Sequence, residues 1–225
     1  MSSKMSITQN LAKIKSQLPD NVALIAVTKT KPVSDILEAY HAGHRIFGEN
    51  KIQEMVEKYE QLPKDIEWHM IGHVQRNKVK YMAGFVSLIH GVDNLKLLKE
   101  IDKQAIKHNR TISCLLQIKI AMEDSKFGLS AEEAKQIVKS REFSELKNIK
   151  VKGVMGMATF TDNSKQIKEE FLYLKKIFEE LKANELLNSE FNIISMGMSG
   201  DYKLAVDCGS NMVRIGSSIF GARNY

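Results

Sequence analysis

Cysteine is scarce in this chain, whose 225 residues include two, Cys114 and Cys208. The two lie far apart in the sequence, and each has apolar neighbours, in ISCLLQI and AVDCGS. This usage excludes a disulfide-stapled fold and a paired-cysteine zinc site, so we expect no metal centre. We interpret both residues as small buried hydrophobes of a protein in a reducing compartment, the cytoplasm.

Long apolar runs and linkers are also lacking. No stretch reaches the length that spans a membrane, and the N-terminus MSSKMSITQNLAKIKSQL has no apolar segment followed by a small-residue cleavage site. With three prolines and no Pro/Gly/Ser-rich segment, we expect one domain over residues 1–225. Hydrophobic residues make up 43% of the chain, which is enough for a packed core.

Charge of one sign does not dominate. The 33 Lys and Arg against 27 Asp and Glu give a formal net charge of +6. The basic residues are scattered among acidic ones, as in KLLKEIDKQAIKHN and KQIKEEFLYLKKIFEELK, and no aromatic-rich RNA-binding signature accompanies them. We therefore interpret them as solvated helix faces and expect neither a nucleic-acid nor a membrane partner.

Short runs of branched and aromatic residues alternate with longer stretches that have apolar residues at helical spacing. After an N-terminal helix within residues 1–20 (about 5–18), eight strands are predicted: ALIAVTK, RIFGEN, EWHMIG, FVSLIHGVD, TISCLLQIKI, VKGVMGMAT, FNIISMGM and NMVRIGSSIFG. A helix-like connection follows each of the first seven, the longest being residues 164–187. Runs such as ALIAV are apolar on both faces, as in a parallel sheet covered by helices. The pattern predicts a single (β/α)8 TIM-type barrel with an extra N-terminal helix; an open doubly wound sheet is the alternative.

Functional residues of such barrels gather where strands end. The predicted strand ends carry Lys29, Glu49, Asn50, His69, Gly72, Asp93, Lys119, Thr159, Met198, Ser199, Arg214 and Gly216. This set is more polar than core packing requires. His69 suits either a ligand pocket or a hydrogen-bonded core position, whereas His73 and QRNKVKY read as the solvent-facing basic start of a helix.

Lys29 ends a strand that would be buried, in LIAVTKTKP, so its amine would face the barrel mouth. Partial desolvation favours the neutral amine, a nucleophile that forms a Schiff base with an aldehyde or ketone. The alternative is that Lys29 extends to the surface, as we expect for Lys31.

Glycine and serine recur after the last two strands, in SMGMSGD and VRIGSS. The corresponding barrel loops frequently bind phosphate through backbone amides and a short helix N-terminus. Ser199, Gly216 and Ser217 are the candidate phosphate ligands; tight turns alone are the alternative. Arg214 then points into the barrel if Gly216 does. A phosphate with an aldehyde for Lys29 and a ring nitrogen for Arg214 describes pyridoxal 5'-phosphate (PLP).

Seven segments occur in order: AVTKTKP, FGEN, HMIGHVQRNK, EDSKFGL, GVMGMA, SMGMSGDY and VRIGSSIFGARNY. Together they resemble the YggS family, also called the PLP homeostasis protein family, from about Leu24 to Tyr225. The resemblance implies a single-domain barrel similar to the N-terminal domain of bacterial alanine racemase, with PLP on the lysine that ends the first strand, here Lys29. It also implies the remaining cofactor-binding residues: Asn50 and His69 beside the cofactor, Ser199, Gly216 and Ser217 at the phosphate, and Arg214 at the pyridine nitrogen.

Two positions depart from the family pattern. Arg76 replaces the small hydroxyl residue of Q[ST]NK, and Lys119 replaces the asparagine of QVN. We expect Arg76 to leave cofactor binding intact. A function that the family assigns to the surface around Q[ST]NK does not carry over to this chain at that position. Lys119 would add positive charge near the pocket, and Lys31 and Lys119 are candidate secondary sites of reaction with an aldehyde.

The resemblance implies control of cytosolic PLP supply without established turnover. We expect a monomeric carrier whose partners include PLP-dependent apoenzymes; the alternative is a PLP-dependent amino-acid racemase of low activity. Racemisation needs a second acid–base group opposite Lys29. The racemases with this fold draw it, a tyrosine, from an additional C-terminal β-domain, which we do not expect here. Arg214 beside the ring nitrogen would also weaken the ring as an electron sink.

Overall fold

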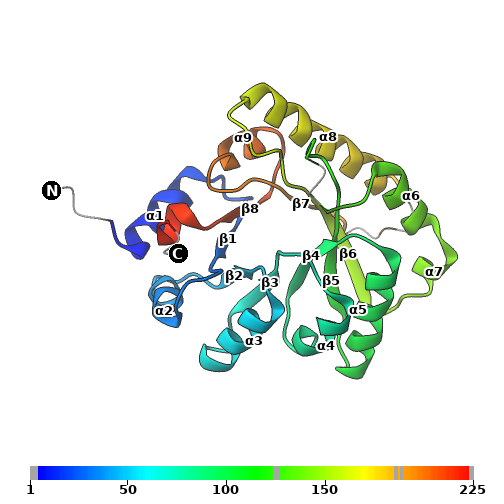
Figure 1. Cartoon of the computed structure of the whole chain (residues 1–225), viewed down its shortest axis with the longest axis horizontal. Coiled ribbons are helices and arrows are strands. Elements are labelled where there is room, and N and C mark those ends of the chain that lie inside the picture. Colours follow the sequence, from blue (N-terminus) through cyan, green and yellow to red (C-terminus); the bar gives the residue numbers. More distant parts are fainter. Residues whose placement is uncertain (1–4, 124–126, 185–186, 188–189, 223–225) are drawn as a thin grey trace.

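The structure is a computed structural model that describes residues 5–123, 127–184, 187 and 190–222. Within these ranges, eight parallel strands close into a barrel in which each strand pairs with the next in the chain and β8 pairs with β1 (Figure 1). The prediction of a (β/α)8 barrel is confirmed, and closure by the β8 to β1 pairing excludes the open doubly wound sheet.

The strands are β1 (Ala23–Val27), β2 (Ile46–Glu49), β3 (Glu67–Met70), β4 (Leu88–Val92), β5 (Ile112–Gln117), β6 (Ile149–Met155), β7 (Ile193–Ser195) and β8 (Met212–Ile215). The helices are α1 (Ile7–Gln17), α2 (Val33–His41), α3 (Ile52–Gln61), η1 (Arg76–Lys78), α4 (Val79–Met82), α5 (Leu95–Lys107), α6 (Ala131–Lys139), α7 (Arg141–Ser144), α8 (Ser164–Lys182), α9 (Tyr202–Asp207) and α10 (Ser217–Phe220).

Both faces of the sheet are buried, which explains the continuous apolar runs of the strands. The inner face forms a small cluster inside the barrel, built from Ile25, Leu88, Leu115, Met155 and Met212. The outer face packs against the helices in a much larger cluster that includes the fully buried Trp68 and Phe47. Alternation along each strand therefore decides which side chains enter the barrel.

The extra helix α1 covers a side of the barrel that α10, with four residues, is too short to cover. Asn10 of α1 donates a side-chain hydrogen bond to the carbonyl oxygen of Ile219 in α10 (3.0 Å), and the two helices lie side by side in Figure 1. The predicted N-terminal helix is confirmed. It begins with a capping box in which the Ser6 hydroxyl accepts from the Gln9 amide and the Gln9 side chain accepts from Ser6.

The predicted last strand is wrong in its second half. β8 ends at Ile215, and residues 217–220 form α10 instead of continuing the strand. The pairing of β8 with β1 ends at Ala26 and Ile215, beyond which there is no ladder for the chain to extend. The predicted helix over residues 164–187 ends at Lys182; residues 185 and 186 lie outside the described part, as do residues 124–126 of EDSKFGL and residues 223–225 of the last segment.

Cys114 and Cys208 are both free and buried, as predicted. Burial raises the pKa of both thiols, so neither is a reactive thiolate. Among the described residues, no helix combines the length and the apolar character that a membrane crossing requires.

Candidate functional site

A cavity of about 550 Å³ lies at the C-terminal ends of the strands. Six of the seven predicted site residues line it, namely Lys29, Asn50, Ser199, Arg214, Gly216 and Ser217. They come from the loops after β1, β2, β7 and β8, from β8 itself and from the first residue of α10, so only closure of the barrel brings them together. The volume suits a ligand of the size of a small cofactor.

Lys29 lies on the turn that follows β1, and it is partly buried. The turn is closed by a hydrogen bond from the Lys31 amide to the carbonyl oxygen of Thr28 (2.9 Å). Asn50 follows β2 on the neighbouring loop. Gly72 lets the loop after β3 approach it, because a Cβ on Gly72 would fall 2.3 Å from the Asn50 carbonyl oxygen.

The loop after β8 presents backbone amides to the cavity. The amides of Gly216 and Ser218 both point at the hydroxyl oxygen of Ser199, at 3.3 and 3.5 Å. Both contacts are long, and they show that the two backbone amides at the start of α10 are directed at the same point, the Ser199 hydroxyl on the loop after β7. Gly197 gives that loop its course: its φ is +101°, and a Cβ there would lie 2.7 Å from Ala205 Cβ.

Arg214 stands at the bottom of the cavity on β8 and is 4% exposed. Its guanidinium donates to the Ser195 hydroxyl (2.5 Å) and to the carbonyl oxygen of Gly156 (3.1 Å). No carboxylate of the described residues lies within ion-pair distance of it. Burial lowers the pKa of Arg214 to about 10, which still leaves it charged at neutral pH. The cavity therefore contains a buried cation without an ion pair among the described residues; the Asp201 carboxylate, which also lines the cavity, attracts it only from beyond ion-pair distance.

His69, which was predicted beside the cofactor, is buried and is not among the residues that line the cavity. Its Nδ1 lies 3.0 Å from His90 Nε2, and His90 Nδ1 lies 2.9 Å from Ser195 Oγ. A buried chain thus connects His69 to Arg214. Burial lowers the pKa of His69 to about 3 and that of His90 well below its usual value, so both rings are neutral.

Some cavity-lining residues were not predicted for this role: His73, Gln117, Phe127, Met157 and Phe160. His73 stacks on Phe127, with ring centroids 4.2 Å apart, and its Nδ1 lies 3.7 Å from an Asp93 carboxylate oxygen. Gln117 ends β5 and donates to the Phe127 carbonyl oxygen (3.1 Å). Gln117 lies two residues after Leu115, whose side chain is inside the barrel, so the alternation of β5 also directs Gln117 inward. The sequence carried this signal, but a single glutamine did not stand out as a functional residue.

The two residues that depart from the family pattern do not line the cavity. Arg76 is exposed on η1, and Lys119 is partly buried on the segment that follows β5. Lys31 does line the cavity, and its Nζ donates to the carbonyl oxygens of Phe220, Gly221 and Ala222 at 3.0–3.2 Å. Lys31 thus holds the C-terminal end of α10 against the turn that carries Lys29.

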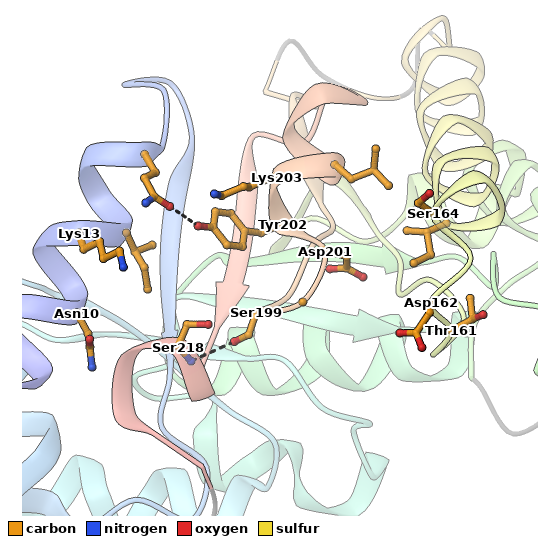
Figure 2. Close-up of a pocket in the computed structure, with 15 residues that line it drawn as sticks. Asn10, Lys13, Thr161, Asp162, Ser164, Ser199, Asp201, Tyr202, Lys203 and Ser218 are labelled. Carbon is orange, nitrogen blue, oxygen red and sulfur yellow. Dashed lines mark hydrogen bonds between the residues drawn. The ribbon is translucent and has the colours of Figure 1, made fainter. Parts of the chain in front are cut away.

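A second cavity, of about 720 Å³, lies on the other side of the loop after β7. Figure 2 shows it between α1, α9 and the loop before α8, with the Ser199 side chain directed at Ser218 of α10. Ser199, Gly200 and Asp201 border both cavities. The second cavity contains none of the other predicted site residues.

Fold and cavity together define a parallel (β/α)8 barrel with a lysine after the first strand and a glycine–serine turn after the last. Residues 3–224 match the family model described as "Alanine racemase, N-terminal domain". The chain is 37% identical to the pyridoxal phosphate homeostasis protein of Pasteurella multocida (strain Pm70) over 98% of this chain and 99% of that protein. It belongs to the pyridoxal phosphate homeostasis protein family.

Solved structures agree with this assignment. PipY of Synechococcus elongatus PCC7942 is 33% identical, with coverage of 96% of this chain and 100% of that one, and TM-scores of 0.89 without PLP and 0.87 with PLP bound. Alanine racemase from E. faecalis has a TM-score of 0.75 at 20% identity, and the match spans 96% of this chain but 58% of the racemase. The racemase likeness shows the fold alone.

Proposed function

We propose that this protein binds PLP in the cavity at the strand ends, holds it through a Schiff base with Lys29, and serves intracellular PLP homeostasis as a cytoplasmic carrier. The observation that carries the proposal is Arg214, a buried cation that faces the cavity and forms no ion pair with a carboxylate of the described residues. A buried charge of this kind calls for a ligand that accepts its hydrogen bonds.

The chain's own groups fit the three polar features of PLP. Amides of the turn at Gly216 would hold the phosphate, the guanidinium of Arg214 would donate to the ring nitrogen, and the Lys29 amine would bond to the aldehyde carbon. PLP supplies electron withdrawal when bound. The relatives named for PLP homeostasis, and PipY with PLP bound, support the same assignment.

Binding and release suit this site better than turnover. A guanidinium at the ring nitrogen disfavours protonation of the ring and weakens electron withdrawal. The described residues that line the cavity include no tyrosine that would act as a second acid–base group opposite Lys29. Phe160 and His73 at the rim are exposed, so the cavity is open to acceptors, for which PLP-dependent apoenzymes are our candidates. Racemisation of an amino acid remains the alternative.

The test is the visible absorbance of the purified protein with added PLP, followed by borohydride reduction and peptide mass mapping. The proposal expects an absorbance band and a reduced adduct on Lys29, both lost in Lys29→Ala. Lys107→Ala is the control, since Lys107 is an exposed lysine in the last turn of α5 and does not line the cavity. A protein that stays colourless with PLP would contradict the proposal.

A further inference from the structure

A second lysine, Lys58, is buried close to the turn that carries Lys29. It lies on α3 and is 6% exposed. Its ammonium group has three short contacts, to the Thr28 carbonyl oxygen (2.7 Å), Glu49 Oε1 (2.6 Å) and Glu54 Oε1 (2.7 Å). Because an ammonium group has three N–H donors, all of its hydrogen-bonding capacity is used.

The same two carboxylates also bind the turn directly. Glu49 Oε1 accepts from the hydroxyl of Thr28 (2.5 Å), and Glu54 Oε1 accepts from the backbone amide of Thr30 (2.6 Å). Lys29 lies between these two threonines. The cluster of Lys58, Glu49 and Glu54 therefore holds the residue on each side of Lys29, and both carboxylates are in turn held by Lys58.

The turn needs such support because its backbone is strained. Thr30 has a φ of +63°, in the left-handed region that a β-branched residue rarely adopts. A conformation of this kind persists only where the surroundings enforce it. Here the enforcing contacts are the Thr30 amide bound to Glu54 and the Thr28 carbonyl oxygen bound to Lys58.

Stability alone does not explain a charged cluster at this place. Removing ammonium and carboxylate groups from water costs free energy that their mutual attraction often only balances, and apolar residues of the same volume stabilise a protein equally well. An apolar residue at this position could not donate a hydrogen bond to the carbonyl oxygen of Thr28, and it could not orient the two carboxylates toward the turn. The charged cluster is therefore needed for the geometry of the turn.

We propose that Lys58 is a positioning residue for the cofactor: through the Thr28 carbonyl oxygen and the carboxylates of Glu49 and Glu54, it fixes the turn that directs the Lys29 amine into the cavity. This inference rests on the proposed function, because it assigns Lys58 a role in the bond between Lys29 and an aldehyde. Lys58 itself does not line the cavity.

Lys31 extends the same arrangement toward the phosphate ligands. It follows the strained turn directly, and its Nζ binds the three carbonyl oxygens at the end of α10. The turn of Lys29 is thus attached to the Lys58 cluster and to the helix whose amides face the cavity. Loosening the turn is expected to separate the two ends of the PLP site, which should lower affinity rather than only slow binding.

The test compares Lys58→Met, which keeps an unbranched side chain one atom shorter and removes the ammonium group, with wild type and with Asp102→Asn. Asp102 is the matched control because it is a buried charged residue of α5 whose carboxylate accepts from the Asn148 amide (2.7 Å) just before β6, at the opposite end of the barrel from the cavity. The readouts are the PLP dissociation constant, the share of borohydride-trapped adduct on Lys29, and hydrogen exchange of residues 28–31 without PLP.

Lys58→Met is expected to weaken PLP binding by about tenfold or more, which corresponds to about 1.4 kcal/mol, to spread the adduct to other lysines, and to speed exchange in residues 28–31. Asp102→Asn is expected to lower thermal stability and leave the affinity and the adduct site unchanged. If Lys58→Met does not fold, Glu54→Ala replaces it, since it removes the acceptor of the Thr30 amide on the more exposed side of the cluster.

The inference is overturned if a folded Lys58→Met or Glu54→Ala protein binds PLP on Lys29 with wild-type affinity. It is equally overturned if Asp102→Asn weakens PLP binding to the same extent, since the effect would then follow general stability. A wild-type protein that does not bind PLP would contradict the proposed function instead, and the exchange of residues 28–31 would still report whether Lys58 holds the turn.

Discussion

The guanidinium of Arg214 donates a hydrogen bond to the hydroxyl of Ser195, a neutral partner where a buried cation commonly has a carboxylate. Beyond Ser195 the chain continues through His90 to His69, and both rings are kept neutral by burial. The barrel interior thus orients the guanidinium through neutral groups, and the Asp201 carboxylate offsets its charge only in part, from beyond ion-pair distance. Burying that charge costs free energy, and a ligand that accepts hydrogen bonds from the guanidinium can offset this cost.

Replacing Arg214 should therefore change stability and binding in opposite directions. In Arg214→Met, the ligand-free protein should be more stable by about 1 kcal/mol, because a buried charge without an ion pair among the described residues is removed. PLP affinity should fall by about tenfold, which corresponds to about 1.4 kcal/mol. Urea unfolding and an absorbance titration measure the two effects.

Arg110→Met is the control for that experiment. Arg110 donates to the carbonyl oxygens of Ala83 and Val86, and it does not line the cavity. Its replacement should lower stability and leave PLP affinity unchanged. A destabilised Arg214→Met protein with normal PLP affinity would show that Arg214 serves the fold.

Ser199 should contribute to binding of the phosphate in particular. Its hydroxyl lies where the amides of Gly216 and Ser218 converge. Ser199→Ala is expected to weaken PLP binding by about 1 kcal/mol, or about fivefold, with a smaller effect on pyridoxal, which lacks the phosphate. Ser164→Ala is the control, since Ser164 lines only the second cavity (Figure 2). Equal losses for PLP and pyridoxal would argue against a phosphate contact.

Glu49 should make stability depend on pH. Burial raises the pKa of its carboxyl from 4.5 to about 7, and the nearby Glu54 carboxylate acts in the same direction, while Lys58 and the Thr28 hydroxyl oppose the shift. The folded protein then binds a proton that the unfolded chain releases at lower pH. The contribution of Glu49 is therefore full below about pH 4.5 and declines as pH rises through 7, by about 3 kcal/mol at most.

Urea unfolding between pH 5.5 and 8 checks this dependence. Glu49→Gln does not titrate, so its stability should decline less with rising pH than that of wild type. Glu170→Gln, which also replaces a buried carboxylate but keeps Glu49, should retain the wild-type decline. Parallel curves for wild type and Glu49→Gln would mean that Glu49 is already ionised at pH 5.5.

Turnover of free amino acids should be slow. Proton exchange at the α-carbon of alanine in D2O, followed by NMR with PLP-loaded protein, is expected below about 1 per second, the low end of typical enzyme rates. The reasons are the guanidinium that we propose at the ring nitrogen and the lack of a tyrosine among the described cavity residues. Exchange at or above that rate would favour the racemase.

The sequence was informative where a residue's position along a strand decided its role. Lys29, Asn50, Ser199, Arg214 and Gly216 were identified because strand ends meet at one end of a barrel, and all of them line the cavity. Strand alternation would also have selected Gln117. His69 was predicted beside the cofactor, but it does not line the cavity, because its ring is buried inside the barrel and is hydrogen-bonded to the ring of His90.

Lys58 and Glu54 were missed for a different reason. At a spacing of four on an amphipathic helix, they read as an ordinary surface ion pair. The burial of Lys58 depends on how α3 packs against β2 and β3. The turn at Thr30 is held by contacts from residues 21 to 30 positions away along the chain. No local pattern encodes such contacts.

The sequence by itself therefore determined the eight strands, their parallel arrangement and the polar residues at their ends, because side-chain periodicity and burial on both faces are local properties of the chain. Only the tertiary structure decided which ends meet, that residues 217–220 turn into α10, and that Arg214 and Lys58 are buried charges with different partners. Closure of the barrel sets these distances, and desolvation inside it sets the charge of each group.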